Sequence, residues 1–355
     1  MELLPSELVI AHRGTTFWAP EETEAAMRWA RNIGADYLEL DLQRTRDGYL
    51  IALHDESLRR TTNVDDVFPD RKDHPVSSFL YEELLTLDAG TWFNKACPDQ
   101  ARDSFRGLEI LLLEDVIHIA EGKRIKRGPD GKRIMRSGEH GRMTPVYETD
   151  PADSGNRPGI YAETKVPQLF PGIEEDLVNE LKRLGWYHED RAALRKIETY
   201  GRVMVADTPF RLILQTFSKE SLKKLHHRFS DYVPKCFLLW RGDAGDDIPD
   251  DRPETFEAWL EYGKNNGATI VGPSIGGEPN HYSDLLTPEN IKAIRRYGLQ
   301  THAYSFDTWE QTRRYGEYCQ GMFTNRAEKT LIWYGKADWE ESAGRAESVL
   351  DALGY

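Results

Sequence analysis

The chain has 355 residues, a formal net charge of −14 and 39% hydrophobic residues. This length and composition exclude a disordered protein and suit one large domain with insertions, or two domains. The acidic balance disfavours nucleic acid and anionic membranes as partners, whereas a local cation can still capture a small anionic substrate.

The chain carries no clear signal for export, membrane insertion or disulfide bonding. Its three cysteines, Cys97, Cys236 and Cys319, stand far apart and predict neither a disulfide framework nor a zinc site. No stretch is long and apolar enough for an integral membrane segment, and residues 1–7 lack the regions of a signal peptide. These features predict a cytoplasmic protein, or a periplasmic or secreted one if a leader has been removed. The oligomeric state stays open.

Short apolar runs alternate with helical patterns along most of the chain. A strand is predicted at 8–11, and a helix opened by Pro20 and ending near Ile33, with Glu21 and Glu22 in its first turn. Further strands are predicted at 37–42, 49–53, 159–162, 212–215, 234–240, 269–271, 301–305 and 321–323. Further helices are predicted at 172–184, 218–227, 255–265, 288–297, 309–315 and 327–334. Repeated βα units of this number predict an α/β protein, a single (β/α)₈ TIM barrel over residues 1–355.

Two stretches interrupt this alternation. Residues 57–108 contain no clear βα unit and predict a small insertion after the second strand pair. Residues 123–158 form a second, basic excursion, and the segment 123–136, with seven Lys or Arg and one Asp, predicts a hairpin closed by Pro129-Asp130-Gly131. A solvated surface hairpin is the favoured interpretation, and an arm that steers phosphate or docks a partner is the alternative.

Residues suited to proton transfer follow two of the predicted strands. In a parallel barrel the carboxyl ends of the strands carry the active site, and His12-Arg13-Gly14 follows the first strand. A histidine can exchange a proton near neutral pH, and an arginine offers a two-pronged contact to phosphate. His54-Asp55 ends the strand at 49–53 and supplies a second imidazole. Cleavage of a phosphodiester needs a base and an acid, which two histidines can provide.

Carboxylates recur on two other strands. Glu39 and Asp41 share one face of their strand, and the residues flanking them on the other face are leucines, which indicates burial. Buried carboxylates repel each other unless a cation lies between them, and hard divalent ions prefer such oxygen ligands. Glu163 and Lys165 also share a face, so that Glu163 can complete a three-carboxylate site and Lys165 can neutralise a phosphate oxygen. A solvated acidic strand and a surface ion pair remain the alternatives.

Taken together, these motifs resemble the glycerophosphodiester phosphodiesterase family over about residues 8–335. The motifs are His12-Arg13-Gly14, Pro20-Glu21-Glu22-Thr23, Glu39-x-Asp41, His54-Asp55, Arg60-Thr61-Thr62, Glu163-x-Lys165 and Thr324 after the last strand. The resemblance implies a barrel with a small insertion after His54. It implies the following site: acid–base residues His12 and His54, phosphate-binding residues Arg13 and Lys165, and Glu39, Asp41 and Glu163 as ligands of one divalent cation.

The resemblance also implies the reaction and a substrate pocket. Glycerophosphodiesters such as glycerophosphocholine would be hydrolysed to an alcohol and sn-glycerol 3-phosphate, the glycerol hydroxyl attacking phosphorus to give a cyclic phosphate that water opens. Similarity to a longer, periplasmic-type branch, at 163–172 and at 302–304, favours Ca²⁺ over Mg²⁺. The expected pocket residues are Glu21, Gln215, Phe217, His302 and Tyr304.

The chain departs from the family pattern in two places, and other functions stay open. Glu22 replaces the usual Asn or His, and is expected either to tune metal affinity or to face solvent. The excursion at 123–158 is not a family feature and leaves the substrate size open. The main alternative is a phospholipase D-like lyase acting on lysophospholipids. A barrel that has lost activity and serves as a binding module, and a metallohydrolase of another phosphate ester, are the others.

Overall fold

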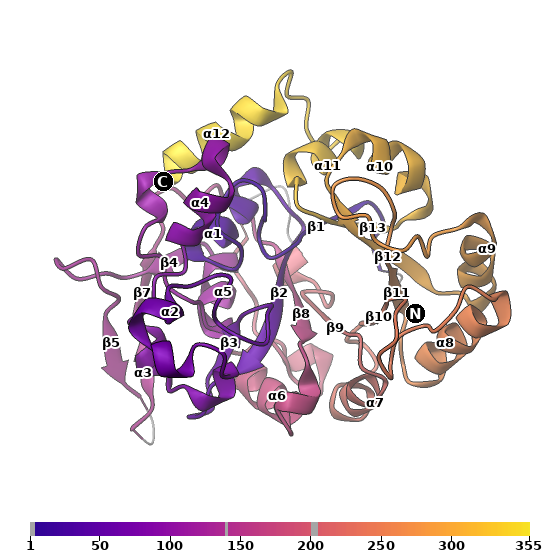
Figure 1. Ribbon diagram of the computed structural model, residues 1–355, viewed down its shortest axis with the longest axis horizontal. Helices are drawn as coiled ribbons and strands as arrows, with labels where there is room; N and C mark the ends of the chain where they lie inside the picture. Colours follow the sequence, from indigo (N-terminus) through magenta and orange to yellow (C-terminus); the bar gives the residue numbers. More distant parts are fainter. Residues whose placement is uncertain (1–3, 139–140, 200–204) are drawn as a thin grey trace.

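The computed structural model describes residues 4–138, 141–199 and 205–355, so residues 1–3 and residues 139–140 of the basic excursion lie outside it. Its main sheet contains the parallel strands β1 (Leu8–Ala11), β2 (Tyr37–Arg44), β8 (Gly159–Thr164), β9 (Leu212–Thr216), β10 (Lys235–Leu239), β11 (Ile270–Pro273), β12 (Gln300–Phe306) and β13 (Gly321–Thr324). These eight strands close into a ring because β1 pairs with both β13 and β2. The predicted barrel is therefore confirmed, and Figure 1 views it nearly end-on.

Helices surround this ring and cover its outer face (Figure 1). They are α1 (Glu24–Ile33), α5 (Leu113–Ala120), α6 (Ile173–Arg183), α7 (Lys219–Arg228), α8 (Pro253–Asn265), α9 (Pro288–Tyr297), α10 (Trp309–Tyr315) and α11 (Ala327–Trp333), and the last helix, α12 (Ser342–Leu353), packs on α1. Among the described residues no helix has the length and apolar character needed to cross a bilayer.

Strand residues alternate between two cores, as β10 illustrates. Cys236 and Leu238 pack inside the ring, whereas Phe237 and Leu239 pack outward beneath the helices. All four are buried, because the strands of a closed parallel barrel are covered on both faces. A residue such as Glu39 or Asp41 that points into this ring therefore cannot be solvated in the ordinary way.

The predicted start of the first helix was wrong. The helix begins at Glu24 rather than Pro20, because the Thr23 side chain accepts a hydrogen bond from the Ala26 N–H and caps the helix there. Glu22 has a left-handed backbone conformation (φ 57°), which ends any helical path from Pro20. Residues 20–23 are consequently a loop, and Glu21 and Glu22 are available to the carboxyl end of the barrel.

We expect Thr23→Ala to lower the free energy of unfolding by about 1 kcal/mol, the usual loss for a removed N-cap. Chemical denaturation of the purified protein measures this change. Thr23→Ser is the matched control, because it retains the capping oxygen and should stay close to the parent. Equal stability of the Ala and Ser variants would contradict the assignment of Thr23 as the cap.

The third predicted strand lies outside the ring. It is β3 (Leu50–Ala52), which pairs antiparallel with the end of β2 and brings His54 to the barrel mouth. The insertion at 57–108 follows and contains the short helices α2 (Val64–Val67), α3 (Tyr81–Leu84) and α4 (Thr91–Ala96) (Figure 1). The second barrel helix, α5, comes only after this insertion, and the sequence patterns did not predict it.

The basic excursion has the predicted turn, but its strands pair differently from a simple hairpin. Arg127 and Arg133 oppose each other across the turn. Beyond it, β4 (Lys123–Ile125) pairs with β7 (Tyr147–Thr149), and β5 (Met135–Ser137) pairs with β6 (Met143–Pro145).

The excursion is attached to the barrel through its arginines. The buried Arg133 guanidinium lies 3.0 Å from both Glu109 and Asp115, and Arg127 pairs with Glu109 and Glu24. These two arginines therefore anchor the excursion to acidic residues beneath it, and their charges are not free to steer a phosphate.

Candidate active site

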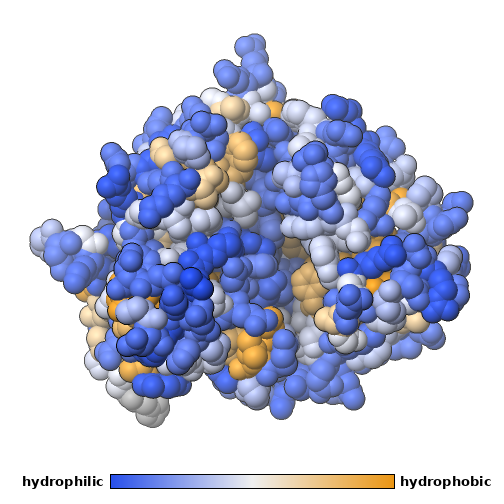
Figure 2. All heavy atoms as spheres, in the orientation of Figure 1, coloured by the Kyte–Doolittle hydropathy of each residue, from blue (hydrophilic) through white to orange (hydrophobic). Residues whose placement is uncertain are grey.

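A pocket of about 320 Å³ opens at the carboxyl ends of the barrel strands. In Figure 2 the hollow near the middle of this face is hydrophilic toward β2 and hydrophobic toward β9 and β10. All predicted site residues except Glu21 and His302 line the pocket, and Leu238, Trp240, Tyr282 and Phe323 complete it. A larger hollow of about 740 Å³ lies at the opposite end of the barrel, but its lining lacks the histidines and the carboxylate cluster.

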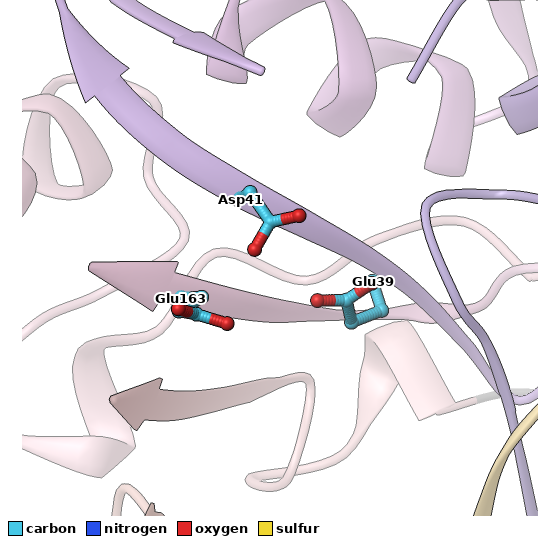
Figure 3. Close-up of side chains that lie close together, drawn as sticks. All are labelled: Glu39, Asp41 and Glu163. Atoms are coloured by element: carbon cyan, nitrogen blue, oxygen red, sulfur yellow. The ribbon is translucent and has the colours of Figure 1, made fainter. Parts of the chain in front are cut away.

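Three buried carboxylates converge in this pocket. Glu39 and Asp41 project from β2, and the parallel register sets Asp41 directly opposite Glu163 on β8. One oxygen of each residue lies within 4.8 Å of the others, and Figure 3 shows the three side chains pointing toward one another. Each residue is at most 4% exposed, so water screens their repulsion very little.

The protonation of these carboxylates is strongly perturbed. Burial, helped by the neighbouring Asp41, raises the pKa of Glu163 to about 8 and that of Glu39 well above its ordinary value. Burial opposes ionisation of Asp41 as well, but Lys165, His54 and Arg13 hold the pKa of Asp41 below its ordinary range. The cluster thus contains more carboxylate than its two cationic side chains neutralise.

This cluster fits a divalent cation. The Asp41 Oδ2 atom is buried and accepts no hydrogen bond within the described residues, although Arg13 Nε lies 3.1 Å away. A hard cation would supply the missing partner and offset the repulsion, and three carboxylate oxygens are the ligand type that Ca²⁺ and Mg²⁺ prefer. Glu39, Asp41 and Glu163 are therefore the residues that could hold a metal.

Two cationic side chains face these carboxylates. Lys165 Nζ lies 3.5 Å from Asp41 and 3.3 Å from Glu163, and Arg13 Nη1 lies 3.0 Å from Glu21. The Arg13 backbone N–H donates to Glu39 Oε2 at 2.7 Å. The sharp turn that places Arg13 requires Gly14, because a Cβ at Gly14 would lie within 2.7–2.9 Å of helix α1.

His12 directly follows β1 and lies deep in the pocket. Its Nδ1 atom lies 2.7 Å from Oδ1 of Asn325, the residue after β13. Burial, together with the nearby Arg13 guanidinium, lowers the pKa of His12 to about 3. The imidazole is therefore neutral at physiological pH, and its Nε2 atom makes no hydrogen bond within the described residues.

His54 is held by a longer network of charges. Its Nδ1 atom lies 2.7 Å from Asp55, which pairs with Arg60 at 2.7 Å. Arg60 in turn pairs with Glu21 at 2.7 Å, and Glu21 contacts Arg13. The network links the start of the insertion to both a histidine and an arginine of the pocket.

The hydrophobic side of the pocket is built from aromatic rings on β9–β12 and the loops that follow these strands. The Phe217 and Tyr304 rings lie 5.8 Å apart edge to face, and Tyr282 lies 6.1 Å from Tyr304 and 5.2 Å from Trp240. Sequence patterns missed Trp240 and Tyr282. Trp240 ends the predicted strand 234–240, which is a usable signal, whereas Tyr282 lies in a loop that carries none.

Other residues singled out from the sequence support the pocket or lie outside it. Gln215 donates to Glu39 Oε1 at 2.7 Å and so orients one carboxylate. His302 does not reach the pocket, because its fully buried ring lies in the barrel interior with Nδ1 at 3.1 Å from the Tyr161 hydroxyl. Glu22 does not face solvent, since it is 4% exposed and accepts a hydrogen bond from the Asp41 N–H at 2.7 Å.

The sequence resembles that of known phosphodiesterases. The family described as "Glycerophosphoryl diester phosphodiesterase family" matches residues 12–145. A glycerophosphodiester phosphodiesterase of Bacillus subtilis (strain 168) is 31% identical over 319 residues, which cover 90% of this chain and 83% of the relative. A glycerophosphodiester phosphodiesterase of Caldanaerobacter subterraneus is 40% identical over 193 residues, covering 54% of this chain and 59% of the relative.

Solved structures share the fold. A phosphodiesterase of Oleispira antarctica, in complex with the product sn-glycerol-3-phosphate, has a TM-score of 0.58 at 17% identity and covers 93% of this chain and 97% of its own. A glycerophosphodiester phosphodiesterase of Agrobacterium tumefaciens has a TM-score of 0.54 at 23% identity, covering 90% of this chain and 96% of its own. These structures agree with the barrel, and the long match to the Bacillus relative establishes that this chain belongs to the glycerophosphodiester phosphodiesterase family.

Proposed function

We propose that the protein hydrolyses glycerophosphodiesters to an alcohol and sn-glycerol 3-phosphate. The observation that carries this proposal is one pocket that combines two histidines, two cationic side chains and three converging carboxylates. Phosphodiester cleavage needs these groups together: a base, an acid, and positive charge at the phosphate. The Bacillus relative bears the name of this activity, and the Oleispira structure contains the product sn-glycerol-3-phosphate.

We infer that one divalent cation binds to Glu39, Asp41 and Glu163. When bound, it would lower the pKa of a substrate hydroxyl and offset phosphate charge. Three carboxylates in one site favour Ca²⁺, since Mg²⁺ usually retains several waters and takes only one or two carboxylates. Ca²⁺ is therefore proposed ahead of Mg²⁺.

The histidines divide the proton transfers between them. His12, buried and neutral, takes the proton of the glycerol hydroxyl through Nε2, and the hydroxyl oxygen then forms a bond to phosphorus. The bond from phosphorus to the alcohol oxygen breaks, and His54 donates a proton to that oxygen. Burial lowers the pKa of His54, whereas Asp41 and the contact with Asp55 favour the protonated imidazole that this step requires. The result is a free alcohol and a cyclic glycerol phosphate.

Water then opens the cyclic phosphate with the two roles reversed. His54, now neutral, takes a proton from the water, whose oxygen bonds to phosphorus. His12, now protonated, returns its proton to the departing glycerol oxygen, which leaves sn-glycerol 3-phosphate and restores both histidines. Arg13 and Lys165 bind the phosphate oxygens in both steps, and the aromatic side offers a surface against which substrate carbons can pack.

The test is release of glycerol 3-phosphate from glycerophosphocholine by purified protein with Ca²⁺, with Mg²⁺ or with EDTA. We expect release with Ca²⁺, less with Mg²⁺ and none with EDTA. Asp41→Asn is the inactive control, because it removes the most strongly ionised carboxylate. Equal release in EDTA would refute the metal site. Absence of release under all three conditions, with cyclic phosphate formed from a lysophospholipid, would instead favour the lyase.

A further inference from the structure

A chain of polar side chains lies behind His12 and takes no part in the proton transfers described above. Asn325 Oδ1 contacts His12 Nδ1 at 2.7 Å, and the Asn325 amide nitrogen donates to Asp307 Oδ1 at 2.8 Å. On the other side of the carboxylate, the Asn280 amide nitrogen donates to Asp307 Oδ2 at 2.9 Å and to Ser305 Oγ at 3.1 Å. The chain therefore connects the ends of β1, β12 and β13 and the loop after β11.

The order of donors along this chain fixes the tautomer of His12. An ionised carboxylate only accepts hydrogen bonds, so Asp307 must face the NH₂ group of Asn325. The Asn325 carbonyl oxygen then faces His12, and because this oxygen only accepts, His12 Nδ1 must carry the hydrogen. The Nε2 atom of the neutral ring is then left with its lone pair, which is the form that a base requires.

The partner of His12 differs in charge from the partner of His54. His54 faces the carboxylate of Asp55, which stabilises a protonated ring, whereas His12 faces a neutral amide, which orients the ring without stabilising its cation. The negative charge of Asp307 contacts Asn325 and not His12. It can therefore orient the Asn325 amide while His12 stays neutral.

We propose that Asn325, oriented by Asp307, is a positioning residue that holds His12 as the Nδ1–H tautomer with Nε2 free to act as the base. The catalytic part of this inference rests on the proposed function, but the tautomer itself does not. Asn280 anchors Asp307 from the same loop that carries Tyr282 into the pocket, so the loop and the base share one support.

Two variants of this hydrogen-bonded chain distinguish control of the His12 tautomer from a purely structural role. In Asp307→Asn, the new side chain must present its oxygen to the Asn280 amide, so its NH₂ group faces Asn325 and turns the Asn325 amide around. His12 Nδ1 then becomes an acceptor, and the hydrogen moves to Nε2. In the double variant Asp307→Asn/Asn325→Asp, a carboxylate at 325 again accepts from His12 Nδ1, and every donor and acceptor in the chain is restored.

Long-range ¹H–¹⁵N correlation spectra of protein labelled at histidine read the tautomer directly, with His12 assigned by comparison with His12→Gln. We expect Nδ1–H in the parent and the double variant, and Nε2–H in Asp307→Asn. Asp307→Asn should also lose roughly 10²-fold or more in kcat with little change in KM. The double variant should regain this lost kcat. Asp284→Asn, the same change of charge in the loop that carries Asn280, should alter neither the tautomer nor the rate.

The inference is overturned if the parent shows His12 as Nε2–H, or if a folded Asp307→Asn variant retains Nδ1–H. The parent spectrum decides even if the single variant does not fold. If no form releases glycerol 3-phosphate while the tautomer changes as expected, the proposed function fails and the positioning chain remains.

Discussion

Substitution of either histidine of the pocket should nearly abolish cleavage, but for different reasons. His12→Gln removes the base and His54→Gln removes the acid, and loss of one such group costs roughly 10²–10⁴-fold in kcat. Because Arg13 and Lys165 still bind the phosphate, KM should change much less. Steady-state kinetics on glycerophosphocholine measures both parameters.

The two roles can be separated by changing the leaving group. A glycerophosphodiester with a 4-nitrophenyl group releases a stable phenolate that needs no proton, so the acid becomes dispensable for that substrate. In the first turnover, His54→Gln should therefore release nitrophenolate at much of the parent rate, whereas His12→Gln should not. Recovery in His12→Gln instead would reverse the assignment, and recovery in neither would show that both histidines act mainly in binding. His281→Gln, at an exposed histidine, is the control.

The barrel and the carboxylate cluster follow from local patterns in the sequence. The alternation along β2 places Glu39 and Asp41 on one face, and the flanking leucines indicate that the opposite face is buried. Local patterns do not determine that Asp41 pairs with Glu163, because the register between β2 and β8 depends on how the whole ring closes.

Residues outside this alternation were harder to predict. His302 lies on a predicted strand near the pocket, but the same alternation that turns Glu39 inward at the mouth buries His302 lower in the ring, beside Tyr161. Asn325 had a usable signal, because it directly follows the last strand, as His12 follows the first. Asp307 had the same signal, because it directly follows β12, whereas Asn280 had none, since it comes from a loop whose approach depends on tertiary packing.

The start of α1 shows how a local rule can mislead. Proline in the first turn followed by two acidic residues is a good opening for a helix, but a threonine cap three residues later provides an equally good one. The later start leaves Glu21 and Glu22 in a loop, where they accept hydrogen bonds from Arg60 and from the backbone of Asp41. Contacts with the pocket thus override the preference for an earlier start.

Removal of the cation should expose a conflict between stability and function within the carboxylate cluster. In EDTA we expect Glu163→Gln to melt at a higher temperature than the parent, although the variant should have lost activity. The reason is that the parent must either bury a third negative charge beside Glu39 and Asp41 or keep a proton on Glu163, and an amide avoids both costs without changing the volume. Thermal unfolding in EDTA measures the difference, with the exposed Glu310→Gln as control.

The difference in melting temperature between Glu163→Gln and the parent should increase as the pH rises. The pKa of Glu163 in the folded protein is about 8, above its ordinary value of 4.5, so between these values the folded state retains a proton that the unfolded state releases. The contribution of Glu163 to the stability of the parent should therefore be greatest below about pH 4.5 and should fall as the pH rises toward about 8, whereas Glu163→Gln lacks this loss. The gap in melting temperature should widen across that window.

Saturating Ca²⁺ should reverse the order of the two proteins. A cation that binds only the folded state adds about 2.7 kcal/mol of stability at one hundred times its dissociation constant, and the parent retains all three carboxylate ligands while Glu163→Gln retains two. The parent should then melt above the variant, with little remaining dependence on pH in this range. If Ca²⁺ and Mg²⁺ both leave the parent curve unchanged, the three carboxylates do not form a cation site, and their convergence would require another explanation.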